Sequence, residues 1–269
     1  MKKIKAVFLD IDGTMVSFKT HVVSQQTKNT IKWLRSIGVK VFVATGRMLP
    51  MLTVLDEIEF DGYITYNGAC CVDSTKTNII YKNTIPQKDI SALIKRLEWD
   101  KFPVSFMCKD NMYVNYIDEN VVKVAEIVGV GMPKLRDAKH AENEDVFQVC
   151  IYVKEEKLNK ILSETLTSCE GSRWIEYFAD VNVIGLNKQS GIDRMLDYFN
   201  IPLNQAMAFG DGGNDIPMLK HVPYGIAMGN SSDLVKSSAS YVTTSVDEEG
   251  ITKAIEYFKE KNYFDFSGI

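Results

Sequence analysis

Two aspartates, Asp10 and Asp12, follow directly after the apolar run at residues 6–9. An ionised carboxylate at the end of a buried strand is costly unless a cation or a hydrogen-bond donor pairs with it. Two more apolar runs end in polar groups, one at Thr45 and one at Asp211. Because ligands collect at the carboxyl ends of parallel strands, we expect these three strand ends to form one site.

The acids expected at this site are hard oxygen ligands. Residues two apart on an extended chain point to the same side, so Asp10 and Asp12 are predicted to face together. With Asp211, and with Asp215 nearby, they would form a cluster of carboxylates without imidazole or thiolate. That ligand type predicts a magnesium site, and Mg²⁺ is therefore the expected cofactor.

The same residue types suit phosphoryl transfer. An aspartate can attack phosphorus to form an aspartyl-phosphate, which divides a difficult hydrolysis into two easier steps. The charge on the equatorial oxygens must then be neutralised by magnesium, a lysine and short-range donors. Gly13 and Gly46 leave backbone amides accessible, the Thr45 hydroxyl can donate to phosphate, and Lys188 is the candidate ammonium.

Short strands and helices alternate in the segments that carry these residues. We expect strands at 4–11, 40–46, 62–68, 206–213 and 224–230, and a helix at 27–37 that ends at Gly38. Strands that are apolar along their whole length suit a parallel sheet covered on both faces.

The middle of the chain has a different character. It is predicted to contain helices at 89–99, 119–128 and 155–166 and strands at 104–108, 112–116, 146–153, 174–178 and 182–186. The expected fold class is α/β, with a Rossmann-like parallel-sheet core domain formed by residues 1–82 and 187–269. Residues 83–186 are predicted to form a large inserted α+β cap domain, and the cleft between the two domains is the predicted site.

Four motifs occur in order along the chain: DIDGT (10–14), ATGR (44–47), NKQSGID (187–193) and GDGGNDIPML (210–219). Together with the large insert between the second and the third, they resemble the haloacid dehalogenase superfamily, specifically the Cof-type phosphatases that act on sugar phosphates and similar metabolites. The resemblance implies that Asp10 is the nucleophile and that Asp12 is the general acid and then the general base.

The resemblance also implies the ligands of the metal and of the phosphoryl group. Asp10, the backbone carbonyl of Asp12 and Asp211 would hold magnesium, and Asp215 would contribute through water. Thr45, Lys188 and Asn214 would grip the phosphoryl oxygens. The residues assigned to substrate binding are Gly13, Thr14, Gly46, Arg47, Asn67 and Asn214.

Several of these residues also have ordinary structural interpretations. Asn67 could occupy a turn that needs a positive φ, and Asp215 could be favourable simply as an acid at a helix N-terminus. Arg47 could be a surface cation at a helix start, and Lys188 taken alone would be a solvated lysine.

Composition limits the classes of partner. The 269 residues include 31 Lys and Arg against 35 Asp and Glu, for a formal net charge of -4, which argues against a nucleic-acid binder. No apolar run approaches the ~20 residues that span a bilayer, and the apolar part of the N-terminus is too short for a signal peptide. Five cysteines without a CxxC pair and three scattered histidines predict buried, reduced thiols and no zinc site. We expect a cytoplasmic protein without a membrane partner, a monomer or weak dimer.

The leading hypothesis is a magnesium-dependent phosphomonoester hydrolase that acts on small phosphorylated metabolites, with sugar (hexose) phosphates as the expected class. A phosphomutase or phosphotransferase would use the same aspartyl-phosphate, and the motifs do not separate these reactions. A non-catalytic, ligand-sensing relative of the fold is a second alternative, against which the intact Asp10, Asp12, Lys188 and Asp211 argue. A receiver-type phosphoacceptor is disfavoured because the chain is too long and the nucleophile lies on the first strand.

Overall fold

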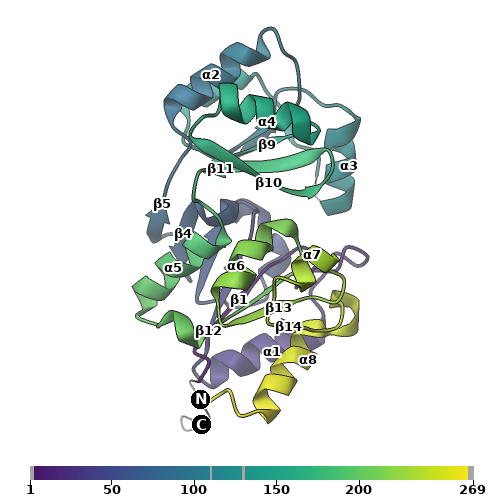
Figure 1. The fold of residues 1–269 in the computed structure, drawn as a ribbon. Coiled ribbons are helices and arrows are strands. Elements are labelled where there is room, and N and C mark those ends of the chain that lie inside the picture. Colours follow the sequence, from purple (N-terminus) through teal and green to yellow (C-terminus); the bar gives the residue numbers. More distant parts are fainter. Residues whose placement is uncertain (1–2, 110, 129–130, 266–269) are drawn as a thin grey trace.

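The computed structural model describes residues 3–109, 111–128 and 131–265, which form two bodies, each with its own sheet (Figure 1). The strands of the first sheet are β1 (Ala6–Leu9), β2 (Lys40–Ala44), β3 (Gly62–Thr65), β4 (Cys70–Asp73), β5 (Ile79–Lys82), β12 (Ala206–Gly210), β13 (Tyr224–Ala227) and β14 (Tyr241–Val242). Their order is β14-β13-β12-β1-β2-β3-β4-β5. The first six strands in this order run parallel, whereas β4 and β5 are antiparallel and form one edge.

Two layers of helices cover this sheet. They are α1 (Gln25–Ser36), α5 (Lys188–Phe199), α6 (Ile216–His221), α7 (Asp233–Lys236) and α8 (Gly250–Glu260). Val7 and Leu9 of β1 pack into the same apolar cluster as α1 and α8, while Ala6 and Phe8 pack with α5 and α6. This alternation follows from the two-residue period of a strand, and it explains why β1 is apolar along its whole length.

The second sheet is built from a continuous stretch of chain. Its strands are β6 (Val104–Cys108), β7 (Met112–Val114), β8 (Lys134–Leu135), β9 (Val146–Ile151), β10 (Cys169–Ile175) and β11 (Phe178–Val183), in the order β10-β11-β9-β6-β7-β8. Helices α2 (Gln87–Leu97) and α4 (Glu155–Glu164) pack on one face. Helix α3 (Glu119–Val128) packs with the side chains of the opposite face, the face that joins the apolar cluster of the first body.

The predicted fold class is confirmed, and the strand at 104–108 and the helix at 119–128 have the predicted bounds. The predicted strands at 174–178 and 182–186 are wrong in register. The hairpin runs from β10 to β11 with its turn at residues 176–177, so Asp180 lies inside a strand. Residues 169–173, the polar start of β10, were not predicted as strand, and β10 is the edge strand of its sheet.

Two further differences concern the first sheet and the thiols. The predicted strand at 62–68 ends at Thr65, and a short 3₁₀ turn follows at Tyr66–Gly68. The antiparallel strands β4 and β5 were not predicted. All five cysteines are buried free thiols, as expected. None of the helices in the described part of the chain has the length and apolar character needed to cross a membrane.

Candidate active site

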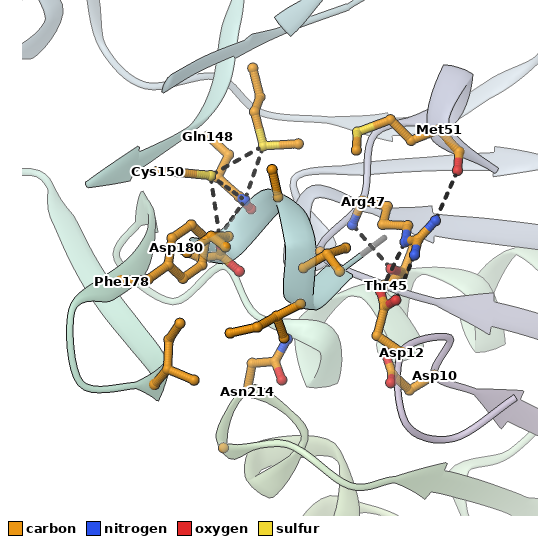
Figure 2. Close-up of a pocket in the computed structure, with 18 of the residues that line it drawn as sticks. Asp10, Asp12, Thr45, Arg47, Met51, Gln148, Cys150, Phe178, Asp180 and Asn214 are labelled. Atoms are coloured by element: carbon orange, nitrogen blue, oxygen red, sulfur yellow. Dashed lines mark hydrogen bonds and ion pairs between the residues drawn. The ribbon is translucent and has the colours of Figure 1, made fainter. Parts of the chain in front are cut away.

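The ends of three neighbouring parallel strands meet at one edge of the first sheet. Asp10 follows β1, Thr45 follows β2 and Asp211 follows β12, and β1 is hydrogen-bonded to both of the other strands. Asp10, Asp12, Thr45 and Arg47 lie together on one side of the pocket, with Asn214 below it (Figure 2). The structure therefore brings together the residues that the sequence placed at separate strand ends.

Asp10, Asp211 and Asp215 form a compact carboxylate cluster, because one oxygen of each lies within 4.8 Å of the others. Lys188, the first residue of α5 and fully buried, donates from Nζ to Oδ1 of Asp10 at 2.5 Å and to Oδ1 of Asp215 at 2.6 Å. Asn187 caps this helix by accepting from the backbone N–H of Ser190. The cap fixes the start of α5 and thereby the place of the lysine.

Burial and charge set the pKa values in this cluster. Burial, followed by repulsion from Asp215, raises the pKa of Asp10 to about 7. Burial and the charge of Asp10 also raise the pKa of Asp211. Burial disfavours the charged form of Lys188, but the ion pairs with the two acids outweigh it and raise the pKa of the ammonium. One ammonium thus faces three carboxyl groups, and with all three ionised the cluster has more negative than positive charge.

The loop that follows β12 is fixed by its own acid. Oδ2 of Asp215 accepts from the backbone N–H groups of Asp211 at 2.9 Å and of Gly212 at 2.8 Å. Thr14 Oγ1 donates to Oδ1 of Asp211 at 2.9 Å. Gly13 has a φ of +81°, and a Cβ atom at this position would collide with the Asp211 carboxylate. Glycine is therefore required both by the backbone conformation and by the close approach of Asp211.

These residues fit a hard divalent cation. The cluster offers carboxylate oxygens from three residues in two segments of the chain and contains no imidazole or thiolate. Such a donor set suits magnesium or calcium better than zinc or copper. A divalent cation here would also balance the negative charge that Lys188 leaves over.

The Asp12 carboxylate lies outside this cluster. Arg47 binds it with two hydrogen bonds, Nε to Oδ2 at 2.9 Å and Nη2 to Oδ1 at 2.6 Å. Strand β1 ends at Leu9 and the chain turns after Asp10, so the two acids do not share the strand geometry that the sequence suggested. Arg47 also donates from its backbone N–H to Thr45 Oγ1 at 3.0 Å, which brings the Thr45 hydroxyl next to this ion pair.

Two side chains of the second body, Gln148 and Asp180, reach this site, and the sequence analysis predicted neither of them. Asn67 donates from Nδ2 to Oε1 of Gln148 and to Oδ2 of Asp180, each at 3.0 Å, and accepts from Nδ2 of Asn214 at 3.0 Å. Asn67 has a φ of +52°, so it occupies the left-handed turn position and also bonds to both bodies. Burial raises the pKa of Asp180 to about 6. Gln148 lies within the largely apolar strand β9 and Asp180 within β11, and such polar residues inside buried strands are the sequence feature that could have identified them.

Comparison with known proteins agrees with this geometry. The family model described as haloacid dehalogenase-like hydrolase matches residues 7–255. The chain belongs to this family. YkrA of Bacillus subtilis is 32% identical, over 94% of this chain and 96% of its own. The 5-amino-6-(5-phospho-D-ribitylamino)uracil phosphatase YitU of Bacillus subtilis is 28% identical, over 94% of this chain and 97% of its own.

Two solved structures of similar chains are described as phosphatases. BT1666 from Bacteroides thetaiotaomicron, a phosphatase of the same superfamily, is 38% identical with a TM-score of 0.88 and 96% of each chain covered. The subclass IIB sugar phosphatase BT4131 is 39% identical with a TM-score of 0.85, covering 95% of this chain and 99% of its own. This member of the haloacid dehalogenase-like hydrolases is therefore a phosphatase.

A cavity of about 440 Å³ connects the carboxylates of this phosphatase with the second body. Asp10, Asp12, Arg47, Asp211 and Asn214 line it on the side of the first body. The volume is in the range of sites for small molecules.

Proposed function

We propose that this chain is a magnesium-dependent phosphomonoester hydrolase that acts on small phosphorylated metabolites through an aspartyl-phosphate. The observation that carries the proposal is the position of Asp10. Its carboxylate lines the cavity, within 4.8 Å of two further carboxylates, and Lys188 donates to its Oδ1 at 2.5 Å. A carboxylate held in this way is oriented for attack on a phosphorus atom bound above it.

In the first step, an Asp10 oxygen attacks phosphorus while the bond to the leaving-group oxygen breaks. Asp12 donates a proton to that oxygen. Both of its oxygens accept from Arg47 in this structure, so one of the two contacts must open for that oxygen to carry the proton, while the other keeps the acid in place. In the second step, Asp12 takes a proton from water, the water oxygen attacks phosphorus, and inorganic phosphate and free Asp10 result. Arg47 thus takes a positioning role in addition to the substrate contact expected from the sequence.

The remaining residues bind the phosphoryl group. Lys188, Thr45 and Asn214, with the backbone amides next to Gly13 and Gly46, would donate to its oxygens. Magnesium would be held by Asp10, the Asp12 carbonyl and Asp211, with Asp215 contributing through water, and it would supply positive charge next to the phosphoryl oxygens. The Thr14 hydroxyl orients Asp211 by its hydrogen bond to that carboxylate.

We also propose the division into a core of residues 1–82 and 187–269 and a cap of residues 83–186, in a cytoplasmic enzyme. The separate sheets of the two parts support the division. Sugar phosphates are the expected substrates from sequence. The sugar phosphatase BT4131 supports this class, whereas YitU is named for a phosphorylated ribitylaminouracil, a ring-bearing phosphoester. Both classes belong in the substrate panel.

The test is phosphate release from such a panel with Mg²⁺, with wild-type protein and Asp10→Asn. We expect many turnovers by the wild type and none by the variant, because an amide cannot act as the nucleophile. Asp145→Asn is a matched control, since Asp145 is exposed and pairs with Lys82 at 2.8 Å away from the site. Turnover by D10N near the wild-type level would remove Asp10 from this role, and the absence of free phosphate with all substrates would favour a mutase or a sensor.

A further inference from the structure

The cap wall of the cavity is apolar over most of its area. Its described residues come from several elements of the second body: Met107 of β6, Met112 of β7, Val124 and Val128 of α3, and Phe178 of β11. The face of the second sheet that lines the cavity belongs to the same apolar cluster as the core of the first body. The part of the substrate beyond the phosphoryl group must therefore contact hydrocarbon and thioether surface.

Polar groups of the cap wall are confined to one place. Among the described cap residues that line the cavity, the amide and carboxylate side chains are Gln148 and Asp180, which bond to each other at 2.9 Å. Both are anchored to Asn67. The hydroxyl of Tyr152, another lining residue, is 3.0 Å from the hydroxyl of buried Ser105 and is used there. On the cap side, polar recognition is thus available along one edge, whereas the core side adds Asn214, Asn230 and Ser232.

This distribution does not match a hexose. A sugar ring carries hydroxyl groups around its whole rim, and each hydroxyl that leaves water needs a hydrogen-bond partner in the site. Among the described residues of the wall formed by α3 and Met112, no side chain that lines the cavity offers one. A ring with apolar faces would bury those faces against α3 and Phe178 and gain from its contact with methionine sulfur, which interacts favourably with aromatic rings.

We propose that the substrate's leaving group carries a largely apolar, planar ring whose polar atoms face Gln148 and Asp180. This inference rests on the proposed function, because it names the substrate class of the same site. The class is a phosphomonoester of an alcohol attached to an aromatic or heteroaromatic ring. A bare hexose phosphate leaves the apolar wall without a partner and is the poorer substrate.

The first experiment compares alkyl phosphoesters that differ in the ring. Uridine 5′-monophosphate and pyridoxal 5′-phosphate are compared with ribose 5-phosphate and glucose 6-phosphate, by phosphate release with Mg²⁺. Aryl phosphates are left out because their activated leaving groups would raise the rate without any contact to the cap. We expect kcat/KM to be at least tenfold higher for the better ring-bearing substrate than for either sugar phosphate, since burial of a few apolar groups is worth this factor.

The second experiment changes the wall. Val124→Asn places a polar group on the cavity face of α3, and Met112→Gln does the same at a half-buried position that tolerates polarity. The ratio measured is kcat/KM for the better ring-bearing substrate divided by kcat/KM for the sugar phosphate. We expect each variant to lower this ratio by fivefold or more. Val122→Asn is the matched control, because Val122 lies on the same helix, is exposed and does not line the cavity. Its ratio should equal that of the wild type.

The outcomes separate this inference from the proposed function. Absence of phosphate release from every substrate would contradict the proposed function itself. Release with equal or higher kcat/KM for the sugar phosphates would overturn the apolar-ring inference and leave the phosphatase proposal intact. An unchanged ratio in a folded M112Q variant would also overturn it, and the melting temperature of each variant establishes folding.

Discussion

The buried lysine provides the sharpest test of how the acidic cluster is held together. Lys188 is fully buried and lies 2.5 Å from Asp10 and 2.6 Å from Asp215. Lys188→Met keeps an unbranched side chain of similar length but leaves both buried acids without their cation. Removal of one partner from a buried ion pair costs about 3–5 kcal/mol, because an uncompensated charge remains. We expect the unfolding free energy to fall by that amount in urea titrations with a chelator present.

An exposed pair of similar geometry is the control. Lys123 pairs with Glu119 at 3.0 Å on the surface of α3. Lys123→Met should cost no more than about 0.5 kcal/mol, as is usual for exposed pairs on a helix. Magnesium should stabilise K188M more than wild type, because the variant lacks the ammonium that repels the metal. The binding energy of the metal adds to the stability of the folded state. If K188M and K123M lost equal stability, and magnesium shifted both alike, the argument from burial would be refuted.

Three further perturbations probe single contacts. Gly13→Ala places a Cβ against the Asp211 carboxylate at a φ of +81°. The magnesium concentration for half-maximal activity should therefore rise at least tenfold, and the melting temperature should fall. An unchanged magnesium dependence would contradict this expectation. Gly213→Ala puts a Cβ 2.6 Å from the carbonyl oxygen of Arg173 in the β10–β11 hairpin, so KM should rise in steady-state assays. A wild-type KM would show that this hairpin does not contact the loop around Gly213 during turnover. The pKa of Asp180 is raised from 3.8 to about 6. The folded state therefore holds this proton more tightly, and stability falls as pH rises from about 4 to 6, by about 3 kcal/mol. In urea titrations at several pH values, Asp180→Asn should not show this decrease in unfolding free energy. Parallel curves of unfolding free energy against pH for variant and wild type would exclude the role of Asp180.

Local sequence patterns predicted the parts of the fold that depend on local physics. Apolar runs covered on both faces identified the parallel strands, and their polar ends identified which segments meet. Asp10, Asp211 and Lys188 come together because strand order and a helix start place them at one edge. The rule that ligands bind at the carboxyl ends of parallel strands can be applied once the strands are identified, without knowing which strands are neighbours in the sheet.

Long-range contacts set the features that the sequence did not reveal. The Asp12 carboxylate turns toward Arg47 because the strand ends one residue before Asp10, and no local pattern fixes that residue. Asp180 fell between the two strands predicted at 174–178 and 182–186, and an acid inside an apolar strand is costly without partners. Its partners, Asn67 and Gln148, lie 113 and 32 positions away in the chain.

The position of β1 within its sheet has a consequence for biosynthesis. Its two neighbours are β2, which follows soon after it, and β12, which begins at Ala206. Every strand of the second sheet lies between them in the chain. A growing polypeptide therefore has all of the second sheet available before β1 can acquire its later neighbour, and one edge of the apolar first strand stays unpaired during that interval. Such an edge is a site for aggregation, so chaperone assistance should matter most between synthesis of β2 and of β12.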